Sequence, residues 1–150
     1  MGGFGSANNK QTGGFAIFNG YLYVGTRNDV TGAQLWRSNN GTTWVPVVTN
    51  GFGDVNNFKL ESLSVFEDAL YAGTDNSVTG MEVLRSTDGL DWGQINPDGF
   101  GDTNNDGTLW SNATIVFRNS LYIGTNNYNG NGGELWQLLK QVYLPLILRN

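Results

Sequence analysis

The side chains best suited to binding a cation lie at positions 102–107, which read Asp-Thr-Asn-Asn-Asp-Gly. Oxygen-bearing side chains at alternate positions, here Asp102, Asn104 and Asp106, followed by a glycine, are typical of the start of a calcium-binding loop. The glutamate that would close such a loop is missing, because Ala113 stands in its place. We favour an ordinary Asn/Asp/Gly-rich turn with no cofactor, and keep a calcium site at these three residues as the alternative.

Other polar side chains could hold a neutral ligand. Asn28, Asn76 and Asn127 stand at equivalent places in three loops rich in Asn, Asp, Thr and aromatic residues. Trp110 lies in a segment without a counterpart elsewhere in the chain, where its ring could stack on a sugar. Amides, hydroxyls and aromatic faces are the kinds of groups that line ligand sites. We therefore expect ligand-binding residues at these four positions, with carbohydrate as the ligand class.

Catalytic chemistry has few candidates. The chain contains no histidine and no cysteine, so it lacks the commonest general base near neutral pH and all thiol chemistry. The carboxylates Glu61, Glu67 and Glu82 follow no pattern that would bring two acids together across a cleft, as glycoside hydrolysis requires. We therefore expect a protein that is not an enzyme.

The charge balance limits the partners. Eight Lys or Arg against 13 Asp or Glu give a formal net charge of −5, with no basic run. Neither nucleic acids nor anionic membranes are expected to bind, because both require clustered positive charge. The N-terminus lacks the features of a signal peptide. The compartment stays open, and an extracellular location is favoured because the cysteine-free, Asn- and Gly-rich composition is compatible with secretion.

The elements that must position these residues are internal repeats. Between residues 15–57 and residues 63–105, 19 of 43 positions are identical without gaps. A Gly-Phe-Gly-x-x-Asn-Asn segment occurs three times, at 3–9, 51–57 and 99–105, and is expected to link the units. Repetition at a period of 20–50 residues indicates a solenoid, a propeller or another stacked array.

Each unit is expected to form four short antiparallel strands. The first strand is expected at 15–18, 63–66 and 114–117, and the second at 22–26, 70–74 and 121–125. The third is expected at 34–38, 82–86 and 134–138, and the fourth at 44–48, 92–95 and 143–147. Two-residue turns at 19–20, 68–69 and 119–120 join the first two strands, the Asn-Gly at 19–20 being a strong hairpin signal. Pro46 and Pro145 indicate that the fourth strand is an edge strand.

These features predict an all-β protein built of β-propeller blades. The three blades are expected at about 3–50, 51–98 and 99–148 within one repeat domain. A β-prism or a β-solenoid is the alternative. The second strands are apolar on both faces, which indicates that both faces are covered. Their internal glycines, Gly25, Gly73 and Gly124, indicate a bulge or the close approach of another backbone.

Three blades cannot close a ring, so self-association is expected. Two copies would give six blades, within the usual range of four to eight, and three copies would give nine. We expect a homodimer, with a homotrimer as the alternative. If Ile123 faces the next blade rather than its own chain, Ile123→Asp should break the ring.

The hairpin between the expected third and fourth strands resembles a known motif. Residues 86–92 read Ser-Thr-Asp-Gly-Leu-Asp-Trp, which is similar to the Asp-box of sialidase-like propellers but one residue shorter. The whole unit also resembles blades of the kelch and tachylectin-like sort. The resemblance implies a propeller blade in which Asp88 binds turn amides. The arginine cluster and the Tyr–Glu pair of sialidases find no match, and Arg37 and Arg85 are expected to make structural bonds.

Three functions are compatible with these patterns. The one favoured is a non-catalytic, lectin-like binding module that uses the repeated Asn, Asp and aromatic loops. The second is a structural or self-assembling scaffold of duplicated blades without a small-molecule site. A sialidase-like glycosidase is the third and the least supported.

Overall fold

The strands form three successive antiparallel groups, here called the first, second and third meander. The computed structural model describes residues 2–107, 113–127, 129 and 132–139. The first meander contains β1 (Gln11–Phe18), β2 (Tyr21–Arg27), β3 (Leu35–Ser38) and β4 (Val45–Val48). The second contains β5 (Lys59–Phe66), β6 (Ala69–Asp75), β7 (Val83–Ser86) and β8 (Gly93–Gln94). The third contains β9 (Thr114–Phe117), β10 (Ser120–Gly124) and β11 (Leu135–Leu139).

Short 3-10 turns are the helical elements of the described residues. They are η1 (Gly2–Gly5), η2 (Gly51–Gly53) and η3 (Asp98–Gly101), one in each copy of the Gly-Phe-Gly segment. The expected all-β class is confirmed. Nowhere in the described part of the chain is a helix long and apolar enough to cross a membrane.

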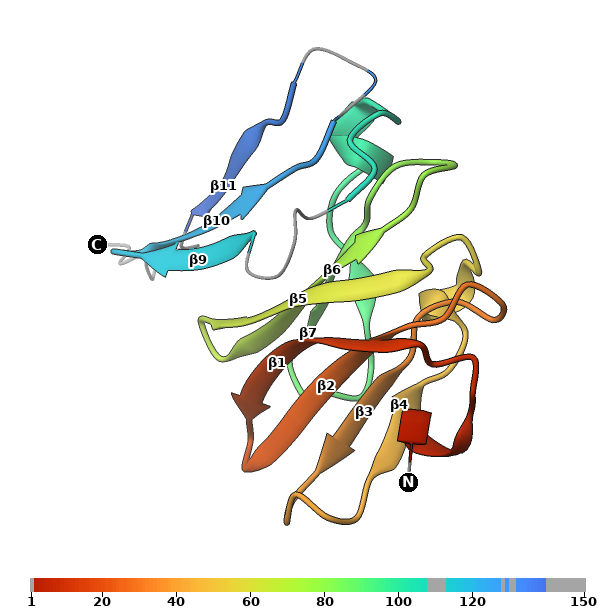
Figure 1. Cartoon of the computed structure of the whole chain (residues 1–150). Helices are drawn as coiled ribbons and strands as arrows, with labels where there is room; N and C mark the ends of the chain where they lie inside the picture. The colour runs from red at the N-terminus through yellow and green to blue at the C-terminus, as the bar shows by residue number, and fades with distance from the viewer. Residues whose placement is uncertain (1, 108–112, 128, 130–131, 140–150) are drawn as a thin grey trace, which may run out of the picture.

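Within each meander, strands that follow each other in the chain pair, and the larger sheet is strongly curled (Figure 1). The first two meanders belong to one sheet, but β2 and β5 are joined by a single residue pair, Arg27 with Lys59. The third meander forms a separate sheet of β9, β10 and β11. The meanders therefore pack against one another as layers and do not form one continuous flat sheet.

The hairpin turns show where local chemistry decides the backbone. Asn19 and Gly20 form the first turn as expected, and both have positive φ. In the second meander the turn residues are Glu67 and Asp68, one position earlier than the expected 68–69, and both again have positive φ. The third turn is also one residue earlier, at 118–119. Two-residue hairpin loops favour positive φ because this matches the twist of the strands, and here the pairing register imposes it on non-glycine residues.

The first strands are longer than expected. β1 and β5 begin four residues before the predicted starts, and each contains a register shift, after Gly13 and after Leu60. Such bulges bend the strand and increase its twist. The edge position expected for the fourth strand is confirmed for β4, which contains Pro46 and pairs with β3 at the end of the sheet. The strand expected at 143–147, with Pro145, lies outside the described residues.

Two apolar clusters hold the meanders together. The cluster between the first and second meanders is formed by Phe18, Tyr23, Ala33, Leu35, Leu60, Leu63, Leu70, Ala72 and Leu84. The cluster between the second and third is formed by Phe66, Ala69, Tyr71, Met81, Val83, Leu121 and Ile123. Ile123 thus packs against the second meander of its own chain, so the condition on which the Ile123→Asp test of ring closure depended is not met.

Close approach of the meanders requires a glycine in β2. A Cβ on Gly25 would lie 2.6 Å from the carbonyl oxygen of Leu60 and 2.8 Å from its Cβ. The backbone contact expected at Gly25 is therefore confirmed. At Gly124 a Cβ would meet Ala113 at an ordinary 3.7 Å.

Candidate functional site

An asparagine from each linker is the centre of a buried hydrogen-bond network. In the second meander Asn57, which is fully buried, donates from Nδ2 to the carbonyl oxygen of Gly51 (2.9 Å) and to Glu82 Oε2 (2.9 Å). Its Oδ1 accepts from Thr74 Oγ1 (3.1 Å) and Asn76 Nδ2 (3.0 Å). Asn57 thereby joins the linker to two strands and a loop, with all its amide hydrogen-bonding atoms engaged.

The same network occurs in the other two meanders. Asn9 bonds to the carbonyl of Gly3, to Gln34, to Thr26 and to Asn28. Asn105 bonds to the equivalent groups, which are the carbonyl of Gly99, Glu134, Thr125 and Asn127. The only change of residue type in the network is Gln34, which stands where the other meanders have a glutamate. Sequence reasoning missed these linker asparagines, although their repetition in all three copies was the available signal.

The loop asparagines singled out as ligand-binding lie inside this network. Asn28, Asn76 and Asn127 are buried. Asn76 Oδ1 accepts from the backbone amides of Val78 and Thr79, both at 3.0 Å, and Asn28 closes its loop in the same way. Ligand contact by these three stays a prediction, and at Asn28 and Asn76 it would require the loss of these bonds. Trp110 lies outside the described residues.

The acidic turn at 102–107 has the geometry of a structural loop. Asp102 Oδ1 accepts from the backbone amide and from Nδ2 of Asn104, both at 2.9 Å, and its Oδ2 accepts from Asn127 Nδ2 at 3.1 Å. These donors hold the pKa of Asp102 below its usual range, and the backbone amide of Asn104 has the largest effect. Asp54 makes the equivalent bonds in the second meander, where the calcium-like pattern is absent.

The third residue of the calcium-like pattern lies apart from these bonds. Burial raises the pKa of Asp106, which disfavours the charged carboxylate. Across the described ranges, no group of three or more His, Cys, Asp or Glu residues could hold a metal ion. Calcium binding at Asp102, Asn104 and Asp106 therefore stays a prediction.

Asp88 binds the turn amides between β7 and β8. Its Oδ1 accepts from the amides of Leu90 (2.8 Å) and Asp91 (2.9 Å) and from Ser86 Oγ (2.9 Å). These bonds hold the pKa of Asp88 below its ordinary value, with the Leu90 amide the main cause. Asn40 makes the equivalent bonds between β3 and β4. An amide oxygen therefore replaces the carboxylate without loss of the turn.

The two repeated arginines also make internal bonds. Arg85 Nε donates to the hydroxyl of Tyr71 at 3.1 Å, and Arg37 lies over the ring of Tyr21 at 4.3 Å. Each arginine thus packs against a tyrosine of the neighbouring strand.

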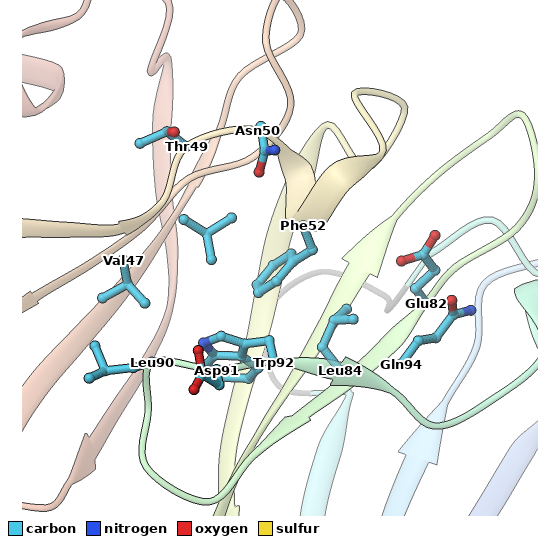
Figure 2. Close-up of a pocket in the computed structure, with 11 residues that line it drawn as sticks. Val47, Thr49, Asn50, Phe52, Glu82, Leu84, Leu90, Asp91, Trp92 and Gln94 are labelled. Carbon is cyan, nitrogen blue, oxygen red and sulfur yellow. The ribbon is translucent and has the colours of Figure 1, made fainter.

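A cleft of about 350 Å³ lies between the first and second meanders. Figure 2 shows Val47 and Thr49 on one side, Glu82 and Gln94 on the other, and Phe52 above Trp92 between them. The remaining lining residues are Val48, Asn50, Leu84, Leu90 and Asp91.

The cleft combines aromatic and polar groups. The rings of Phe52 and Trp92 meet edge to face, with centroids 5.4 Å apart, and both are partly exposed. Asp91 and Gln94 are exposed at its mouth. Glu82 is largely buried, and that burial raises the pKa of its carboxyl. None of these lining residues was predicted as ligand-binding, because they come from two repeats and converge only when the repeats pack.

Comparison of the chain with protein-family models, with curated proteins and with solved structures found no match.

Proposed function

We propose that this protein is a non-catalytic β-propeller module that binds a saccharide in the cleft between its first two meanders. The observation that carries the proposal is the convergence of the Phe52–Trp92 pair with Asp91, Gln94 and Glu82 around about 350 Å³ of space. That volume lies in the range of small-molecule sites, which are typically apolar clefts with a few placed polar groups.

The propeller interpretation is supported by the packing of the meanders. Antiparallel meanders that follow each other at spacings of 48 and 51 residues and bury apolar faces against their neighbours are arranged as blades would be. The chain would then supply three blades, the third completed by the strand expected at 143–147.

Saccharide is the ligand class that fits the lining. Aromatic rings offer faces on which the apolar side of a sugar can pack. The carboxylate of Asp91 can accept from its hydroxyl groups, and so can Oε1 of Gln94, whose Nε2 already donates to the carbonyl of Asn96 and to Asp98. A non-catalytic role is supported by the position of Glu82, whose carboxylate accepts from Asn57 at 2.9 Å as part of the repeated network.

Binding is tested with a glycan array and then by calorimetry on the wild-type chain. We expect Asp91→Ala to weaken the binding of the saccharide found on the array by about ten- to a hundredfold, the cost of about one hydrogen bond to a charged group. Trp92→Leu, which removes the ring, should weaken binding further.

The matched control is Thr87→Ala, an exposed residue of the same hairpin that does not line the cleft. Its affinity should equal that of the wild type. Absence of saccharide binding by the wild-type chain at millimolar concentration would refute the proposal, as would equal affinity of the wild type, Asp91→Ala and Trp92→Leu.

A further inference from the structure

The two outer meanders each have one covered and one bare face. The second meander is packed on both sides, against the first and against the third. At one position of the third strands, Leu35 and Val83 are 0% and 1% exposed, whereas the equivalent Leu135 is 73% exposed. Leu135 on the bare face of the third meander therefore corresponds to side chains that a neighbouring meander covers in the first and second meanders.

An aromatic pair on the same face repeats this pattern. The rings of Phe66 and Tyr71 are 6.2 Å apart at 50°, and those of Phe117 and Tyr122 are 6.4 Å apart at 52°. Phe66 is 6% exposed because the third meander covers it, whereas Phe117 is 56% exposed. The third meander thus exposes the same aromatic arrangement that the second meander buries against its neighbour.

The first meander has the opposite bare face. Leu63 of β5 packs against the first meander and is 8% exposed, but the equivalent Phe15 of β1 is 60% exposed. Ile17, two positions further along the same strand, is 75% exposed. Residues two apart in a strand lie on one face, so these side chains form an apolar patch at the other end of the molecule.

We infer that a second copy of this chain covers both patches, its third meander packing against the first meander of its partner. This contact is made twice inside the chain already, between the first and second meanders and between the second and third, and the two bare patches are its two halves. Soluble proteins rarely leave large apolar patches uncovered. The inference stands whether or not the cleft binds a saccharide.

A second aromatic hollow lies on the first meander. Phe4 meets Trp44 edge to face at 5.4 Å and 67°, the same values as for Phe52 and Trp92. Together with Trp36 and Thr43 these rings line an open hollow of about 530 Å³. It lacks a wall like the one that Val47–Asn50 of the first meander provide in the first cleft.

Light scattering coupled to size exclusion tests the inference on the wild-type chain at micromolar concentration. We expect a mass twice the 16.3 kDa of one chain, which corresponds to a closed ring of six meanders. Three times that mass would equally support head-to-tail docking, in a ring of nine. A folded, monodisperse species of one chain mass would overturn the inference.

Two charged variants test which faces meet. Leu135→Asp alters the third meander and Phe15→Asp the first, and since both side chains are exposed, each variant should fold, which circular dichroism checks. Alone, each should have the mass of one chain, because every contact then contains one altered face. Val30→Asp, an exposed loop valine outside both patches, is the control and should keep the wild-type mass.

Mixing the variants distinguishes head-to-tail docking from any other contact. One unaltered third meander and one unaltered first meander are then present on different chains. An equimolar mixture of Leu135→Asp and Phe15→Asp should therefore recover a species of two chain masses. Failure of the mixture to associate, or wild-type assembly by either variant alone, would overturn the proposed contact.

Discussion

At the scale of single residues, asparagine side chains rather than charged side chains satisfy most of the buried polar groups of the repeated network. Asn9, Asn57 and Asn105 each offer two donors and an acceptor, and each is used completely by neighbouring groups inside the fold. An amide can satisfy buried backbone and side-chain groups without the desolvation cost of a charge. Glu82 is the exception, a largely buried carboxylate in the same network.

Glu82→Gln should raise stability at pH 7 and should leave it unchanged in acid. Burial raises the pKa of Glu82 in the folded state, so the folded protein binds more protons than the unfolded chain, and stability falls as pH rises through this range. The penalty is absent below the ordinary glutamate pKa of about 4.3 and complete above the folded pKa. For a chain of this length, each kcal/mol gained corresponds to a rise in Tm of about 2–4 °C.

The measurement is the difference in Tm between variant and wild type from about pH 3.5 to about pH 8, a range that begins below the ordinary glutamate pKa and ends well above it. Gln34 occupies the equivalent position in the first meander and accepts from Asn9 at 2.7 Å, so a glutamine fits the site. Asp91→Asn, an exposed carboxylate of the same meander, is the control. A Tm difference independent of pH would contradict the assigned cause.

At the scale of elements, the meanders pack closely because β2 contains a glycine where it meets β5. Gly25→Ala should destabilise the protein by about 1–3 kcal/mol, since the added methyl group would overlap the backbone of Leu60, which cannot move without loss of strand pairing. Chemical denaturation gives the free energy of unfolding. Gly93→Ala is the matched control, because a Cβ there meets nothing within 4 Å. Equal effects of the two substitutions would show that Gly25 is not a packing constraint.

At the scale of the whole molecule, stability should depend on concentration if the outer faces are covered by a second copy. Association of folded chains stabilises them by mass action. The Tm of the wild type should therefore rise with protein concentration, whereas the Tm of Leu135→Asp should stay constant. Differential scanning calorimetry over a hundredfold range of concentration measures this. A wild-type Tm that does not change with concentration would argue against the ring.

The sequence by itself determined the class and the strand order. Short continuous apolar runs around Tyr23, Tyr71 and Tyr122, bounded by turn residues, are typical of strands covered on both faces. Pro46 marked an edge strand, because proline cannot donate to the next strand. These are local properties of the chain, so they could be read without coordinates.

The tertiary structure alone decided which neighbour covers each face. A period of two indicates that Tyr122 and Ile123 lie on opposite faces, but not that Ile123 packs against its own chain. The burial of Asn76 and the cleft around Trp92 likewise arise where two units meet. Contacts between units depend on the relative placement of segments distant in sequence, and no local pattern encodes that placement.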